Sequence, residues 1–143
     1  MSDVVVKRLS AGDEAEAQRF DEAFDATVER DLAARYLADE RHHLVVAYVN
    51  DEPAGVATST EILRPDKAPE LFLNELVVIP AYRRRGVAGA LLAESKRLAA
   101  DRGCTAIWVL TDDDNEGGKA TYAAAGGRRL EGTTVMFQID PGA

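Results

Sequence analysis

Residues 75–90 read ELVVIPAYRRRGVAGA, so that an apolar run, a proline, three arginines and a glycine follow one another directly. An apolar strand that ends at Pro80, followed by a helix that begins near Gly86, leaves backbone N–H groups unpaired at the helix start. These donors and the positive end of the helix dipole form an anion site. Because arginines occupy positions 83–85 in a chain of net charge −8, we expect the anion to be a phosphate.

The spacing of this turn is neither G-x-x-x-x-G-K-[ST] nor G-x-G-x-x-G. It fits R-x-x-G-x-A, read at Arg83, Gly86 and Ala88. On these residues the chain resembles the GNAT acetyltransferases, whose pattern Q/R-x-x-G-x-G/A holds the pyrophosphate of acetyl-coenzyme A. The resemblance implies acetyl-CoA as co-substrate. It assigns the pyrophosphate to the turn residues Arg83, Arg84, Arg85, Gly86, Val87, Ala88, Gly89 and Ala90.

A second stretch fits the family pattern N-x-x-A-x-x-x-Y followed by glycine, with Asn115, Tyr122 and Gly126; Gly118 replaces the usual alanine. The resemblance implies that Asn115 and Tyr122 contact the coenzyme and that Tyr122 faces its sulfur. A tyrosine of pKa ~10 is a weaker acid than a thiol of pKa ~8.5. We therefore expect Tyr122 to hydrogen-bond to the departing thiolate rather than to protonate it fully.

The apolar run also has a place in the resemblance. In the family, the strand at Leu76, Val77 and Val78 parts from its neighbour at a β-bulge, and its backbone binds the pantetheine arm. The N–H at the position of Val78 would polarise the thioester carbonyl, because a bulge leaves donors that the sheet does not use. Taken without the turn, the same three residues are typical of a plain core strand.

Acidic residues provide candidates for handling an amine acceptor. An ammonium of pKa ~10 must lose a proton before it attacks, which costs about 4 kcal/mol at pH 7. Glu75, beside the expected bulge, is the candidate base, and an ion pair within the sheet is its structural alternative. An acidic run where the cleft should open is predicted to bind further ammonium groups, or else forms a solvated loop or helix cap. Its members are Asp112, Asp113, Asp114 and Glu116.

Within the superfamily the chain looks most like the class I aminoglycoside 3-N-acetyltransferases. The matching features are Phe20 and Phe24, Tyr36-Leu37, Ile62–Pro65 and the C-terminal residues 136–141. The resemblance implies acetyl transfer to a primary amine of a small cationic substrate, at the 3-N position of an aminoglycoside. Two alternatives stay open: another amine (a polyamine, an amino acid or a protein N-terminus), and a non-catalytic acetyl-CoA sensor, which Gly117-Gly118 would favour.

The remaining patterns predict a single domain over residues 1–143 of mixed α/β (α+β) class. Expected strands lie at 4–8, 43–49, 55–63, 71–78 and 104–110, with a closing pair at 128–130 and 133–139; the clearest helices are 86–101 and 115–125. A break at 25–27 divides the preceding helical region. The resemblance implies a mostly antiparallel GNAT sheet of roughly six to seven strands, splayed at a bulge and flanked by about four helices.

Composition limits the classes of function. With 25 acidic against 17 basic residues, the surface should repel nucleic acid. No run is long enough to span a membrane and no signal-peptide pattern begins the chain, so we expect a cytoplasmic protein. Cys104 is expected to be a core residue, and the spacing of histidines and carboxylates predicts no metal site. The family resemblance leaves a homodimer open.

Overall fold

A computed structural model gives the structure of residues 3–142. The elements in chain order are β1 (Val4–Leu9), α1 (Glu14–Ala17), the 3-10 helix η1 (Gln18–Ala23), α2 (Arg30–Ala38), β2 (His42–Val49), β3 (Glu52–Ile62), β4 (Glu70–Val78), the 3-10 helix η2 (Pro80–Tyr82), α3 (Val87–Asp101), β5 (Ile107–Val109) and α4 (Glu116–Ala124). The predicted helices at 86–101 and 115–125 are confirmed within a residue. The predicted break at 25–27 separates η1 from α2.

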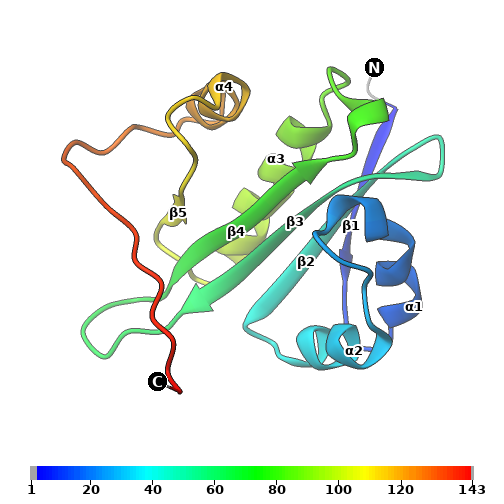
Figure 1. The fold of residues 1–143 in the computed structure, drawn as a ribbon, viewed down its shortest axis with the longest axis horizontal. Coiled ribbons are helices and arrows are strands. Elements are labelled where there is room, and N and C mark those ends of the chain that lie inside the picture. The colour runs from blue at the N-terminus through cyan, green and yellow to red at the C-terminus, as the bar shows by residue number, and fades with distance from the viewer. Residues whose placement is uncertain (1–2, 143) are drawn as a thin grey trace.

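The strands form one mixed sheet in the order β1-β2-β3-β4-β5 (Figure 1). Neighbouring strands from β1 to β4 are antiparallel, whereas β5 runs parallel to β4 after the crossover through α3. The mostly antiparallel α/β fold is therefore as predicted. The strand number is not, because the sheet has five strands over residues 3–142 rather than six or seven.

Each face of the sheet has its own buried cluster. On one face, α3 packs Leu91 and Leu98 against strand residues such as Val45 and Leu73. These helix residues recur at helical spacing, so α3 buries a continuous stripe. On the other face, α1, η1 and α2 cover a cluster around Phe20, which has 0% exposure. Helices therefore cover both faces of the sheet. The end of β4 is followed by η2 and then by α3, so this connection lies at one end of the sheet.

Gly55 on β3 lies under the start of α3, where there is no room for a side chain. A Cβ at this position would stand 2.6 Å from the Val77 carbonyl oxygen and 3.1 Å from Val87 Cγ1. We expect Gly55→Ala to lower the free energy of unfolding by about 1–3 kcal/mol, because backbone cannot move aside as a flexible side chain does. Urea unfolding measures the loss. Gly117→Ala is the control, since its Cβ meets only one atom, at 4.0 Å, in a helix that alanine favours.

The predicted closing pair, Arg128–Leu130 with Thr133–Ile139, is wrong. The described part of the C-terminal segment, residues 125–142, contains neither helix nor strand and extends away from α4 (Figure 1). Val135, Met136 and Phe137 are 68%, 87% and 82% exposed. Strand-forming residues need a sheet edge and an apolar surface to pack on. Within residues 3–142 the segment pairs with no strand, and its apolar side chains lie at the surface of the protein.

The expected strand at 104–110 is also shorter than predicted, because β5 comprises only Ile107–Val109. The residues before it are held by other contacts. Cys104 N–H donates to the Ala99 carbonyl at the end of α3, and Thr105 N–H donates to the Pro69 carbonyl. Within residues 3–142, every helix is too short or too polar to traverse a bilayer.

Candidate active site

The turn between β4 and α3 presents a row of backbone donors. Gly86, with φ 82°, and Arg84, with φ 64°, adopt the left-handed conformation just before the helix. The first helical hydrogen bond is donated by Ala90 N–H to the Gly86 carbonyl at 3.1 Å. Nowhere in residues 3–142 is there an acceptor for the backbone N–H groups of residues 84–89. An anion placed at this helix start would meet both these donors and the helix dipole.

The arginines of the turn carry charge that the rest of the described chain does not neutralise. Arg83, Arg84 and Arg85 are exposed, and no carboxylate of residues 3–142 pairs with them. The guanidinium of Arg85 lies 6.0 Å from the ring centre of Tyr82. Elsewhere, arginines such as Arg8 are ion-paired. The three turn arginines thus remain available to a ligand.

Next to this turn the sheet opens. β5 pairs with β4 only along Leu71–Leu73, whereas β4 continues to Val78. Ile79 N–H donates to the Ala54 carbonyl of β3 at 2.8 Å. Successive N–H groups of an extended chain point to opposite edges of the strand. Since the N–H of Ile79 points toward β3, the N–H of Val78 points toward the other edge of β4, where β5 no longer pairs. The opening therefore has a backbone donor at the place predicted for polarising a carbonyl.

The bulge itself lies earlier in β4 than predicted. Thr58 of β3 stands opposite Glu75 and Ser59 opposite Leu73, so that Asn74 has no partner residue. The strand is regular from residue 76 to 78, where the sequence reasoning placed the bulge. The position differs because the sheet parts where the short β5 ends, and the extra residue falls beside that point.

Glu75 is half-buried and points toward the α2 side of the sheet. Thr58 Oγ1 donates a hydrogen bond to Glu75 Oε1 at 2.9 Å. Tyr36 of α2 is near: burial raises the pKa of its phenol, and the charge of Glu75 adds to that effect. Sequence reasoning did not single out Thr58. The signal was the polar run at 58–60 inside an otherwise apolar strand, which a core role alone does not explain.

Tyr122 of α4 packs against the same buried cluster as Leu76 and Val78. Burial raises the pKa of the Tyr122 phenol, which makes it a still weaker acid. Asn115 caps the helix: its Oδ1 accepts from Gly118 N–H at 3.0 Å, and its Nδ2 donates to Thr111 Oγ1 at 2.9 Å. A Cβ on Gly118 would lie 2.5 Å from this Nδ2, which explains the glycine in place of the usual alanine.

The acidic run is exposed, and part of it is already neutralised. Asp113 pairs with Lys119 and with Arg129, each at 3.2 Å, and these cations lower the pKa of its carboxyl, the Lys119 hydrogen bond most. Glu116 also pairs with Lys119, at 3.3 Å. Asp112 and Asp114 have no ion-pair partner among the described residues. Two of the four candidate substrate-binding residues, Asp113 and Glu116, thus already form ion pairs within the protein.

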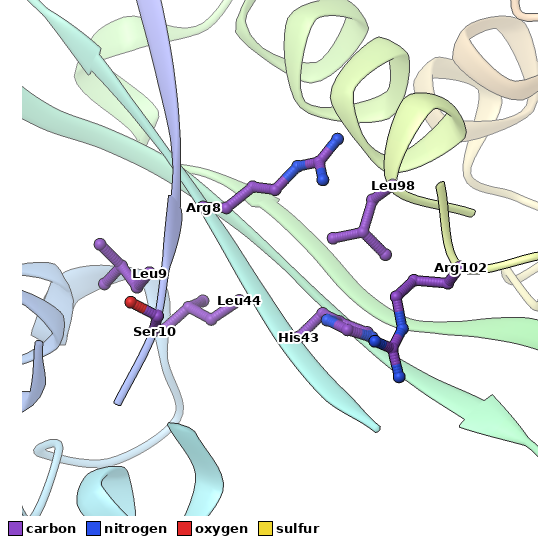
Figure 2. A pocket seen from close by; sticks show the side chains of 7 residues that line it. All are labelled: Arg8, Leu9, Ser10, His43, Leu44, Leu98 and Arg102. Atoms are coloured by element: carbon purple, nitrogen blue, oxygen red, sulfur yellow. The ribbon is translucent and has the colours of Figure 1, made fainter. Parts of the chain in front are cut away.

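Two other features lie apart from this opening. Burial, followed by the charge of Glu61, raises the pKa of the Cys104 thiol, so it is not an activated nucleophile. A cavity of about 210 Å³ lies between β1, β2 and the C-terminal end of α3 (Figure 2). Its charged side chains are paired: Arg8 with Glu94, and Arg102 and His43 with Glu61. It sits at the opposite end of α3 from the turn.

Comparison with known proteins identifies the family. The acetyltransferase (GNAT) family model matches residues 10–126, and the chain belongs to that family. It is therefore an acyltransferase. An uncharacterized N-acetyltransferase of Mycobacterium tuberculosis is 28% identical over 112 residues, which cover 78% of this chain and 69% of that protein.

Two further relatives are named as aminoglycoside acetyltransferases. The type 1 aminoglycoside N(6')-acetyltransferase of Salmonella typhimurium is 32% identical over 66 residues, 46% of each chain. The crystal structure of HMB0005, an aminoglycoside acetyltransferase from an uncultured soil metagenomic sample, has a TM-score of 0.83 and 27% identity over 98% of this chain and all of that one. The position named among these relatives is 6', so the finer resemblance to 3-N enzymes is not supported.

Proposed function

We propose that this protein transfers the acetyl group of acetyl-CoA to a primary amine of a small cationic substrate of the aminoglycoside type. The observation that carries the proposal is the turn at 83–90, which lies beside the parted strands β4 and β5. Among the described residues, the amides of residues 84–89 have no acceptor and the three arginines have no acidic partner. Such a turn suits the pyrophosphate of acetyl-CoA. The opening between β4 and β5 suits the extended pantetheine arm, which joins the pyrophosphate to the thioester. Acetyl-CoA supplies the activated acyl group.

In the proposed mechanism, the acetyl group passes directly from the thioester to the amine, and three residues around the opening have separate roles. Glu75 accepts the proton that the attacking amine must lose. The Val78 N–H donates a hydrogen bond to the carbonyl oxygen as negative charge develops there. Tyr122 donates a hydrogen bond to the departing sulfur, and its raised pKa keeps its own proton in place. An acyl-enzyme is not part of the proposal, because the thiol of Cys104 stays protonated.

The charge of the chain suits a polycationic acceptor. The net charge of −8 gives the protein a field that attracts cations on average. We infer that Asp112 and Asp114, which are free of ion pairs in the described chain, hold the remaining ammonium groups of the acceptor. Asp113 and Glu116 would have to release Lys119 to take part.

An assay of thiol release tests the proposal, with acetyl-CoA and a panel of aminoglycosides, polyamines, amino acids and N-terminal peptides. We expect aminoglycosides to accelerate release above the rate with water. NMR of the product distinguishes the 6' from the 3-N position. Release with a peptide or a polyamine alone would favour the alternative amines. Tight binding of acetyl-CoA without transfer to any amine would favour the sensor.

Tyr122→Phe tests the role of the phenol. Removal of the hydroxyl should lower kcat about tenfold, because one hydrogen bond to a developing charge contributes roughly 1.5 kcal/mol or more. The ring keeps its packing, so calorimetric affinity for acetyl-CoA should hardly change. Thr121→Val on the neighbouring position, whose hydroxyl donates to the Gly117 carbonyl, is the control. A large loss of acetyl-CoA affinity in Tyr122→Phe would contradict the assignment.

We further propose that the protein forms a homodimer through its C-terminal segment. Apolar side chains there are left in water, with Met136 and Ile139 87% and 84% exposed. A second copy offers the same segment, so two copies can pair these residues about a twofold axis. Light scattering after gel filtration should give twice the chain mass. Phe137→Asp should yield monomers, and Val5→Asp, at a 62% exposed position of β1, should not.

A further inference from the structure

The bulge in β4 decides which face of the sheet carries Glu75. Before the bulge, Leu71 and Leu73 pack in the cluster under α3. In an unbroken strand Glu75 would follow them onto that apolar face, because alternate residues share a face. After the bulge it is Leu76 and Val78 that pack under α3. The extra residue therefore moves the carboxylate out of the α3 core and onto the opposite face.

On that face a single buried hydroxyl meets the carboxylate. Thr58 is 6% exposed, and its Oγ1 donates to Glu75 Oε1 at 2.9 Å. No other residue of the described chain donates a hydrogen bond to this carboxylate, so Oε2 stays available. The ionisable group facing Glu75 from α2 is Tyr36, whose own hydroxyl donates to the His43 carbonyl at 2.6 Å. Thr58 alone therefore fixes the orientation of the carboxylate.

We propose that Thr58 is a positioning residue for the transfer, holding Oε1 of Glu75 so that Oε2 faces the incoming amine. The inference rests on the proposed function, in which Glu75 accepts the proton. A fixed carboxylate needs less reorganisation when the amine arrives.

Thr58→Val removes the hydroxyl and keeps the branched shape. We expect kcat/KM for the amine to fall about tenfold, since a hydrogen bond to a charged group is lost. The loss should lie in kcat rather than in KM for the amine, because the hydroxyl orients the base and does not contact the acceptor. Thr58→Ser should restore kcat/KM. Thr60→Val removes a hydroxyl that contacts Asn74 instead, at 2.8 Å, and should leave kcat/KM unchanged.

The outcomes separate this inference from the proposed function. Wild-type kcat/KM in Thr58→Val, or equal losses in the valine and serine variants, would overturn the positioning role while Glu75→Gln remained impaired. Full activity of Glu75→Gln would instead remove the base from the proposed function. If Thr58→Val does not fold, the double variant Thr58→Ala/Glu75→Gln tests the positioning role. Because Thr58 acts through Glu75, the double variant should be no less active than Glu75→Gln alone, and a further loss would contradict the inference.

Discussion

Gly86→Val is expected to abolish the binding of acetyl-CoA, with a dissociation constant at least about 100-fold higher. At φ 82°, Gly86 has a conformation that a β-branched residue avoids. The turn must rearrange, and the N–H groups of residues 84–89 are then displaced from the positions in which the proposed function has them bind the pyrophosphate. Loss of two charge-assisted hydrogen bonds, at roughly 1.5 kcal/mol each, accounts for this factor. Isothermal titration calorimetry measures it.

Gly12→Val is the matched control for backbone strain. Gly12 has φ 97° in the loop between β1 and α1, and a Cβ there meets no atom within 4 Å. The control carries similar strain far from the turn, so its affinity for acetyl-CoA should equal that of the wild type. If Gly86→Val bound as tightly as this control, the pyrophosphate could not lie at the turn.

Glu75→Gln is expected to lower kcat by about 100-fold or more, the usual contribution of a general base. The amide has the shape of the carboxylate, and its oxygen can still accept the hydrogen bond from Thr58. It cannot take the proton of the amine. Stopped-flow or steady-state thiol release measures the loss.

The affinity of Glu75→Gln for acetyl-CoA should be unchanged, because the proposed function assigns Glu75 to the acceptor amine and not to the coenzyme. Glu52→Gln, at an exposed position where β3 begins, removes a charge without touching the opening and should keep full turnover. Equal activity in the two glutamine variants would show that Glu75 only holds the sheet together.

The features that sequence predicted well depend on residues close together in the chain. The apolar stripe of α3 and the arginine-glycine turn before it are local signals, and the structure has both. The same holds for the helix that carries Tyr122, whose start is set by the cap at Asn115. These signals were enough to predict a turn with free backbone donors before α3 and to indicate the family.

The features that were missed depend on distant partners. The segment 133–139 has the alternating pattern of a strand, but it can form a strand only where it pairs with another strand that is distant in the sequence. The bulge at Asn74 is set by the pairing of β4 with β3 and by where β5 ends. The contact of Thr58 with Glu75 joins residues 17 positions apart. No local pattern determines such pairings, although the polar run at 58–60 in β3 indicated a role other than core packing.

The helix that bears Tyr122 is attached to the molecule more loosely than α3. Within α4, all of which the structure describes, no residue is buried, whereas α3 buries six. Elements with few buried contacts open first in native-state amide hydrogen exchange. Amides 119–124 should therefore exchange with solvent deuterium much sooner than those in the middle of α3. A ligand that contacts α4 should slow that exchange, so mass spectrometry can follow occupancy of the site without any turnover.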